Sequence, residues 1–165
     1  MIKVVSKKPK RVRKPALEIG WREHVGLPDL GIPELSAKID TGARTSALHT
    51  TDLGTFDKEG EQWIMFCVPL AGGHSHDIRT ARILDERKIK NTSGEAETRY
   101  VIETTLVFGN REWKIEVSLA DRTKMTSDLI LGRSAIRGRR LLVNPGRSFL
   151  VGPPIGHRHA HSTAA

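Results

Sequence analysis

Two short stretches of this sequence carry residues that together are capable of chemistry. The first is D-T-G-A at residues 40–43, which follows the apolar end of a predicted strand. The triplet D-T-G is common in turns, because aspartate forms Asx turns and glycine tolerates positive φ. The second is L-I-L-G-R at residues 129–133, an apolar strand with glycine and arginine about ninety residues later. Both motifs in this order indicate a carboxylate site, although a plain turn and a plain strand end are the structural alternative.

A loop carboxylate can activate water for hydrolysis when a second carboxylate lies beside it. Two carboxylates about 3 Å apart cannot both ionise, so they share one proton. The ionised partner takes a proton from the attacking water, and the neutral partner donates to the developing oxyanion. If each carboxylate sits on its own D-T-G loop, as the resemblance described below implies, the single D-T-G of this chain requires the second carboxylate to come from another copy. This reading predicts a two-fold homodimer with Asp40 of each copy on the axis.

The neighbours of Asp40 suit the same chemistry. The Thr41 hydroxyl is able to hydrogen-bond across the axis and hold the two carboxylates in register. Gly42 has no Cβ, so its backbone N–H is able to approach the carboxylate and stabilise its charge. We therefore assign Asp40, Thr41 and Gly42 as the catalytic residues, and we expect neither a metal nor a cofactor.

These motifs resemble those of the retropepsin-like aspartic proteases, which carry one D-[ST]-G-A loop and one later apolar-apolar-Gly-Arg strand per chain. The run K-I-D-T-G-A-R-T-S-A-L-H at residues 38–49 is most similar to a bacterial family long labelled "ATP-dependent zinc protease" and later regrouped as retropepsin-like. The resemblance covers roughly residues 18–151. It implies a barrel-shaped aspartic endopeptidase in which Ile130, Leu131 and Gly132 pack across the catalytic loop and support it.

The resemblance also implies substrate contacts, with one departure at Arg44. Viral members usually have an acid at this position, ion-paired with the arginine of the second motif, here Arg133. Two cations repel, so the side chains diverge, an acid elsewhere intervenes, or the site binds an anion. Lys38 shares a strand face with Asp40 by alternation. We assign Lys38, Ala43, Arg44 and Arg133 to substrate binding, and the usual dimer ion network is not expected.

A groove with these cations and without the usual acid favours peptides rich in glutamate or aspartate, through charge-assisted contacts. Members of the resembling bacterial family are linked to the ligase that adds glutamates to a small-subunit ribosomal protein, which points to acidic tails as substrates. The alternative is that Arg44 forms a salt bridge with an acid of its own fold and never meets substrate.

Residues 72–99 fall where retropepsin-like proteins place the hairpin flap that covers substrate. Gly72, Gly73 and Gly94 are able to hinge or tip such a hairpin, and we include Gly72 and Gly73 in the substrate-binding set. Glycine in a hairpin needs no functional reason, so a plain hairpin is the alternative.

A metal-dependent hydrolase is a second enzyme hypothesis. His74, His76 and Asp77 lie together beside two glycines, although a polar loop is the simpler explanation. The sequence has no H-E-x-x-H and no cysteine pair at ligand spacing. Three alternate histidines at 157, 159 and 161 indicate incidental metal affinity. Nothing supports ATP dependence, because there is no G-x-x-x-x-G-K-[ST].

The elements that position these residues are predicted to be almost all β. Short strands at regular spacing favour an all-β closed barrel with a short helical turn near the C-terminus. The clearest hairpin joins strands at 99–108 and 112–119 around Gly109-Asn110. Residues 26–33 are a predicted turn-rich link, and 50–60 a loop or hairpin. The other predicted elements are strands at 17–25, 35–39, 61–70, 78–89, 129–131, 141–143 and 148–151, a helical turn at 134–137, and core positions for Trp21, Trp63 and Trp113.

Composition fits one soluble domain. The 165 residues are 38% hydrophobic and 28% charged, enough to bury a core. No apolar run approaches the ~20 residues of a membrane helix, and the N-terminus has no signal-like apolar segment. Cys67, the single cysteine, lies in an apolar run and is predicted to be a buried structural thiol. A cytoplasmic setting is expected.

The net charge of +8 is concentrated at the N-terminus. Residues 1–15 hold seven of the 27 Lys and Arg and no acid, so the remainder is nearly neutral with its 19 acids. We expect a disordered basic tail at 1–15, the domain at 16–152 and a frayed tail at 153–165. The basic tail either solubilises the protein or weakly contacts RNA or the ribosome through phosphates. In the non-enzyme hypothesis the barrel is a binding module with this tail, and Asp40 is structural.

Overall fold

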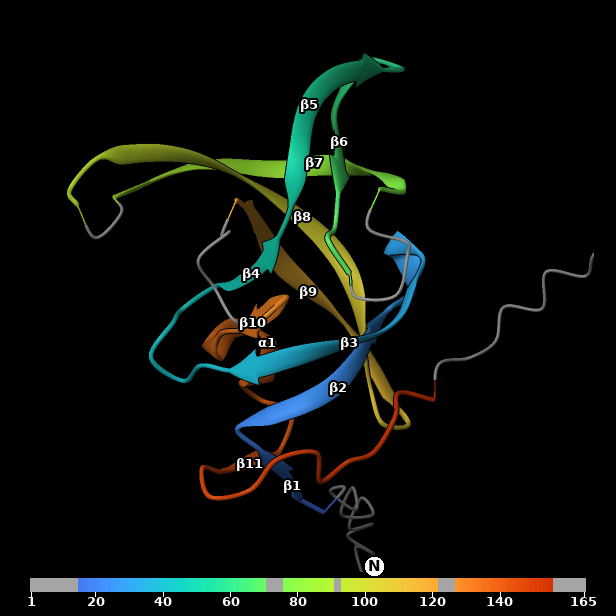
Figure 1. Ribbon diagram of the computed structural model, residues 1–165, viewed down its shortest axis with the longest axis vertical. Coiled ribbons are helices and arrows are strands. Elements are labelled where there is room, and N and C mark those ends of the chain that lie inside the picture. Colours follow the sequence, from blue (N-terminus) through green and yellow to red (C-terminus); the bar gives the residue numbers. More distant parts are fainter. Residues whose placement is uncertain (1–14, 71–75, 91–92, 122–126, 156–165) are drawn as a thin grey trace, which may run out of the picture.

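The protein is described by a computed structural model that defines residues 15–70, 76–90, 93–121 and 127–155. Within these ranges the regular structure is nearly all β (Figure 1). The helical elements are η1, a 3-10 turn (Pro28–Leu30), and α1 (Arg133–Ile136), and no described helix could reach across a membrane. The strands are β1 (Leu17–Gly20), β2 (Arg22–Leu27), β3 (Ile32–Ile39), β4 (Ser46–His49), β5 (Thr51–Lys58), β6 (Glu61–Cys67), β7 (Ile78–Lys90), β8 (Ala96–Phe108), β9 (Arg111–Ala120), β10 (Leu129–Leu131) and β11 (Leu141–Asn144).

One sheet closes into a barrel. Its order begins β2-β3-β10-β4-β9-β8, and β2 pairs again with β8 through Gly26 and Val107. A Cβ at Gly26 would lie 2.8 Å from the Pro33 carbonyl oxygen, so the closure needs glycine. The remaining strands β7, β6 and β5 continue outward from β8. The predicted all-β closed barrel is confirmed, and its short helical turn is α1.

Alternate side chains along each strand fill the barrel. In β9, Trp113, Ile115 and Val117 are buried, whereas Lys114 and Glu116 between them are exposed. This alternation follows from the two-residue period of a strand, which sends successive side chains to opposite faces. Apolar residues of β2, β3, β4, β6, β7, β8 and β10 complete the same core. The sequence pattern of β9 therefore identifies which face points inward.

The N-terminal strand differs from the prediction. The predicted strand at 17–25 is broken at Trp21, because β1 pairs in parallel with β11 while β2 joins the barrel. Trp21 is 36% exposed, so its predicted core position is wrong, and the Arg22 guanidinium lies 4.6 Å from its ring centroid. The predicted link at 26–33 is also shorter than expected, since β2 and β3 both extend into it.

Several local predictions are confirmed. The hairpin around Gly109-Asn110 joins β8 and β9, and residues 51–67 form the β5–β6 hairpin. Trp113 and Cys67 are buried, whereas Trp63 is half-buried. These elements depend mainly on local turn chemistry and strand alternation, which a sequence displays directly.

The predicted strand at 148–151 is wrong. Phe149 has φ 55, a left-handed conformation that interrupts a strand. The segment lies against β2, where the Phe149 N–H donates to the Arg22 carbonyl over 2.8 Å. Its neighbours bond to the side chain of Glu23, so a carboxylate replaces the expected strand partner.

Glu23 is a completely buried carboxylate (0% exposed). It accepts hydrogen bonds from the backbone N–H groups of Gly20 at 2.7 Å, Leu150 at 2.9 Å and Val151 at 3.3 Å. Charge-assisted bonds of this kind are stronger than neutral ones. Glu23 therefore joins the bend between β1 and β2 to the C-terminal segment.

We predict that Glu23→Gln destabilises the fold. The amide has nearly the same volume, but it replaces one acceptor oxygen with a donor that faces a backbone N–H. The expected loss in free energy of unfolding is about 1–3 kcal/mol, measured by urea denaturation. Glu34→Gln is the matched control, because Glu34 is an exposed partner of His24 at 3.3 Å and its loss should cost less than about 0.5 kcal/mol. Equal losses in the two variants would contradict the role of Glu23.

Candidate functional site

The candidate site is built on the loop of residues 40–45, which joins β3 to β4. Strand β10 lies between these two strands, parallel to β3 and antiparallel to β4. The loop therefore has to pass over the end of β10. Asp40 begins it, and its N–H donates to the Leu131 carbonyl at 2.9 Å. The first motif is thus placed by the second, as expected from their order.

The Asp40 carboxylate is held through one of its two oxygens. Oδ1 accepts the backbone N–H groups of Gly42 at 2.9 Å and Ala43 at 3.1 Å. A Cβ at Gly42 would lie 3.2 Å from the same oxygen, so glycine leaves the N–H room to approach. No described residue hydrogen-bonds to Oδ2, and Asp40 is half-buried while Thr41 and Gly42 are exposed. One oxygen is fixed and the other is available to water or to a second carboxylate.

Gly132 allows the loop to cross β10 at close range. A Cβ there would lie 2.7 Å from the carbonyl carbon and oxygen of Thr45. The Gly132 N–H donates to the Ser46 hydroxyl at 3.1 Å, and the Ser118 hydroxyl donates to the Ser46 carbonyl at 3.0 Å. The support predicted for Ile130, Leu131 and Gly132 corresponds to this packing, since all three are buried. The supporting roles of Ser46 and Ser118 were not predicted. The sequence signal for them was the presence of a polar residue within an apolar strand.

Arg133 holds the loop from the other side. Its guanidinium Nη1 donates to the carbonyl oxygens of Thr41 at 2.9 Å and Gly42 at 2.8 Å. Its backbone N–H donates to the Ala43 carbonyl at 2.8 Å. Helix α1 is fixed in turn by Trp113, whose Nε1 donates to the Ala135 carbonyl at 2.8 Å. Arg133, predicted to bind substrate, thus bonds to the carbonyls of the loop of residues 40–45.

Arg44 and Lys38 are exposed cations beside the loop. Neither takes part in an ion pair among the described residues, and every acidic residue of the chain lies within the described ranges. The alternative in which Arg44 pairs with an acid of its own fold is therefore not observed among the described residues. Arg133 turns to the loop carbonyls, which agrees with divergence of the two cations.

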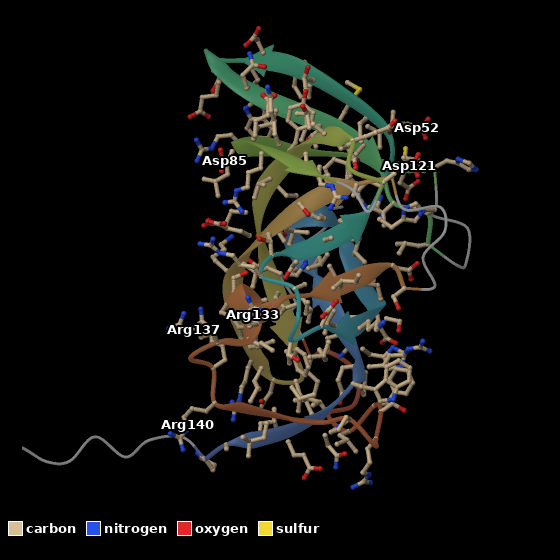
Figure 2. The ribbon with its side chains drawn as sticks, turned by 90° about the vertical axis from the view of Figure 1, so that its left-hand side faces the viewer. Asp52, Asp85, Asp121, Arg133, Arg137 and Arg140 are labelled. Carbon is tan, nitrogen blue, oxygen red and sulfur yellow. The ribbon has the colours of Figure 1, made fainter. Side chains whose placement is uncertain are left out.

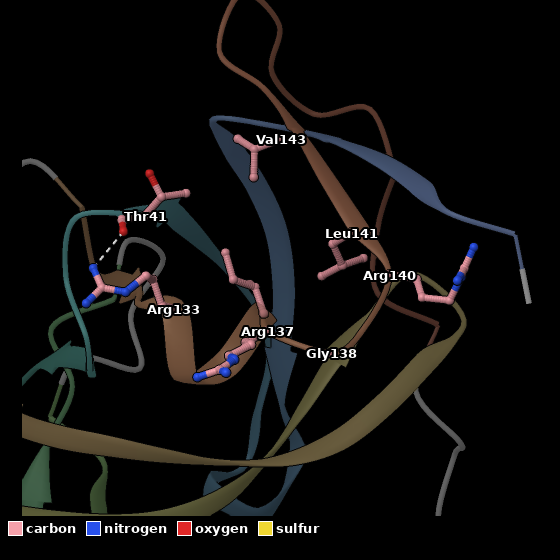
Figure 3. A pocket seen from close by; sticks show the side chains of 8 residues that line it. Thr41, Arg133, Arg137, Gly138, Arg140, Leu141 and Val143 are labelled. Atoms are coloured by element: carbon pink, nitrogen blue, oxygen red, sulfur yellow. Dashed lines mark hydrogen bonds between the residues drawn. The ribbon is translucent and has the colours of Figure 1, made fainter.

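A hollow of about 500 Å³ adjoins the loop. Figure 3 shows Thr41 and Arg133 on one side of it and Leu141 and Val143 of β11 on the other, with Arg133 bonded to Thr41. Ile136 completes the apolar part of the lining. Figure 2 shows Arg133, Arg137 and Arg140 along one side of the barrel, and all three line the hollow. An apolar surface with basic residues thus lies next to the catalytic loop.

The β7–β8 hairpin is the described part of the predicted flap. It projects to the same side of the barrel as the loop of residues 40–45 (Figure 1). Gly94 lies near its turn with φ 84. Gly72 and Gly73 lie outside the described residues, and they precede β7, so they are not part of the hairpin itself.

The metal hypothesis receives no support from the described residues, among which no group of three or more His, Cys, Asp or Glu could hold a metal ion. His74 lies outside the described ranges. The carbonyl of His76 accepts a hydrogen bond from the Cys67 thiol at 3.7 Å. We therefore derive no step through a metal.

Comparisons with known proteins agree with this geometry. A family model described as RimB-like, retropepsin-like aspartic endopeptidase RimB, matches residues 18–154. Relatives from Desulfotalea psychrophila (40% identical), Shewanella pealeana (37%) and Parasynechococcus marenigrum (42%) align over 136 residues, which is 81% of this chain. Each is named probable alpha-L-glutamate ligase, and the chain spans only 29–30% of their length. A Legionella pneumophila protein of unknown function has a crystal structure with TM-score 0.70 and 28% identity, covering 81% of this chain and 97% of that one.

We predict that Gly132→Ala displaces the catalytic loop. The new Cβ would meet the Thr45 backbone at 2.7 Å, and backbone cannot rotate away as a side chain does. We expect a loss of about 1–3 kcal/mol in unfolding free energy, with amide NMR shifts that change mainly at residues 40–46. Gly146→Ala is the control, because its Cβ would meet its nearest neighbour, the Asn144 side chain, at an ordinary 3.4 Å. A Gly132→Ala protein with unchanged loop shifts would refute this constraint.

Proposed function

Because this chain belongs to the RimB-like family of retropepsin-like aspartic endopeptidases, we propose that it hydrolyses peptide bonds with water activated by two Asp40 carboxylates, one from each copy of a homodimer. The observation that carries the proposal is the Asp40 carboxylate itself. One oxygen accepts two backbone N–H groups, and no described residue bonds to the other. A chain with a single D-T-G supplies half of such a pair.

The proposed mechanism assigns each carboxylate a separate role. The ionised Asp40 takes a proton from water as the water oxygen attacks the peptide carbonyl, while the protonated Asp40 of the partner subunit donates to the carbonyl oxygen. The N–H groups of Gly42 and Ala43 stabilise the negative charge. In the second step the newly protonated Asp40 gives its proton to the amine nitrogen as the C–N bond breaks, and a hydroxyl of the tetrahedral intermediate returns a proton to the other Asp40 as the carbonyl re-forms. The pair ends, as it began, with one shared proton.

The surface around Thr41 supports pairing with a second copy. Thr41 is exposed at the loop, beside an apolar wall of Ile136, Leu141 and Val143. A copy that brings its own Asp40 to this loop would cover apolar surface as it docks, and this burial would favour the dimer.

We further propose glutamate-rich peptides as substrates. Arg44 and Lys38 are exposed and have no ion-pair partner among the described residues, so they are available to substrate carboxylates. The three relatives are named for the joining of L-glutamate, which agrees with glutamate chains as the material handled by this family. Contact of residues 1–15 with RNA stays a prediction, since residues 1–14 lie outside the described ranges.

We predict that Asp40→Asn abolishes hydrolysis while the fold is retained. An amide can neither take the proton from water nor share one, so kcat should fall by about a thousandfold or more. Thermal unfolding should show an unchanged or slightly higher midpoint, because one source of repulsion in the dimer is removed. Asp52→Asn, an exposed aspartate outside the loop, is the control and should retain activity. Loss of activity with chelator, together with an active Asp40→Asn, would favour the metal hypothesis instead.

The same variant tests the shared pair. Mixing wild-type protein with excess Asp40→Asn should suppress activity, because heterodimers hold only one working carboxylate. Specific activity should also fall on dilution in parallel with the dimer measured by sedimentation. A monomer with undiminished specific activity at low nanomolar concentration would exclude the shared mechanism.

We predict that Arg44→Ala selectively weakens cleavage of acidic peptides. Loss of one charge-assisted hydrogen bond of about 1.4 kcal/mol should lower kcat/KM on poly-glutamate about tenfold, and more at low salt. A neutral peptide should be cleaved at nearly the wild-type rate. Arg82→Ala is the control, since Arg82 is exposed and pairs with Glu61 on the outer strands at 3.5 Å. Equal losses on both peptides would make Arg44 a structural residue.

A further inference from the structure

A second cavity lies at the far end of β3 from Asp40. It measures about 530 Å³ and is formed by η1 and the start of β7. Since η1 precedes β3 and Asp40 follows it, the eight residues of β3 separate the two sites by roughly 25 Å. Figure 1 shows η1 and the start of β7 on the opposite side of the barrel from the loop of residues 40–45. The cavity is therefore distinct from the proposed catalytic site.

Arg79 in the wall of this cavity is a buried charge with little compensation. Arg79 and Glu23 are the buried charged side chains among the described residues. Glu23 accepts three backbone N–H groups, whereas the Arg79 guanidinium donates one hydrogen bond among the described residues, from Nη1 to the Asp77 carbonyl at 3.1 Å. Its Nε has no hydrogen-bond partner, although the side chain is only 8% exposed.

No carboxylate among the described residues forms an ion pair with Arg79, and all 19 Asp and Glu lie within the described ranges. Two exposed arginines of the same strand, by contrast, do have acidic partners. Arg82 pairs with Glu61, and Arg87 pairs with Asp85 and Glu116. A guanidinium stays charged in proteins, and a buried charge without a counterion is costly. The buried Arg79 guanidinium therefore has no counterion among the described residues.

The two aspartates that line the cavity are already engaged. Asp29 accepts Lys114 Nζ at 2.8 Å and both the N–H and the hydroxyl of Thr105, at 2.8 and 2.7 Å. Burial raises the pKa of Asp29, but these hydrogen bonds outweigh it and the pKa is lowered. Asp77 also has a bonding partner of its own. The charge left without a counterion in the cavity is positive.

We propose that this cavity binds a small amino acid, whose carboxylate pairs with Arg79. A planar carboxylate matches the paired donors of a guanidinium, and the cavity volume falls in the range of small-molecule sites. Asp29 and Asp77 already have partners, but their negative charge in the same wall still disfavours a phosphate dianion, so a ligand whose carboxylate is balanced by its own ammonium group is preferred. The exposed Thr80 hydroxyl supplies a further polar contact at the rim.

The test is titration of the intact protein with L-alanine, acetate and inorganic phosphate at constant ionic strength, followed by amide NMR shifts. Wild-type protein should show saturable shifts at Gly31 and Thr80 with L-alanine, weaker ones with acetate and the weakest with phosphate. Arg79→Met should lose at least tenfold in L-alanine affinity. Arg82→Met, which removes the neighbouring exposed arginine, should bind as wild type does.

Stability gives an independent readout. Arg79→Met replaces a buried charge with an apolar side chain of similar length, so the ligand-free variant should unfold at or above the wild-type temperature. L-Alanine should raise the midpoint of wild type and of Arg79→Lys, but not that of Arg79→Met. The proposal is overturned if no saturable shift occurs in wild type, if Arg79→Met binds equally well, or if phosphate binds more tightly than L-alanine.

Discussion

The close crossing of the loop of residues 40–45 over β10 is the constraint on which the candidate site depends. Because β10 lies between β3 and β4, the chain that leaves β3 must pass over the end of β10 to reach β4. A Cβ on residue 132 would lie 2.7 Å from the Thr45 backbone, so the crossing leaves no room for a side chain there. Three backbone bonds then fix the crossing, from Asp40 to Leu131, from Arg133 to Ala43 and from Ser134 to Arg44. Two motifs about ninety residues apart are therefore one structural unit.

This unit also explains the departure at Arg44. When the guanidinium of Arg133 bonds to the carbonyls of Thr41 and Gly42, it needs no acid two residues after the glycine to hold the loop. The position taken by Arg44 is then released from a structural role. Arg44 is exposed and has no ion pair among the described residues, so its guanidinium is available for the substrate contact proposed above.

The sequence predicted those features that depend on local chemistry. Alternation identified the inward face of β9, and Gly109-Asn110 marked the turn between β8 and β9. The two motifs also identified the loop and its support. Two predictions were wrong because they depend on distant partners. The segment at 148–151 is held by the Glu23 carboxylate instead of a neighbouring strand. Trp21 is exposed because the chain changes sheets between β1 and β2. Closure through Gly26 and Val107 and the loop contacts of Arg133 depend on tertiary structure in the same way.

Comparison of the two buried charges shows why an unpaired group is informative only in context. An exposed arginine such as Arg44 is solvated by water, so its lack of an ion pair costs little. Glu23 is buried, but three N–H groups replace the water it has lost, and the fold gains a fixed C-terminal segment. Arg79 is buried with one carbonyl acceptor and an unpaired Nε, and no segment of the described chain is visibly held in return. It also opens on a cavity large enough for a ligand. A burial cost with no visible structural gain among the described residues supports the ligand proposed for this cavity.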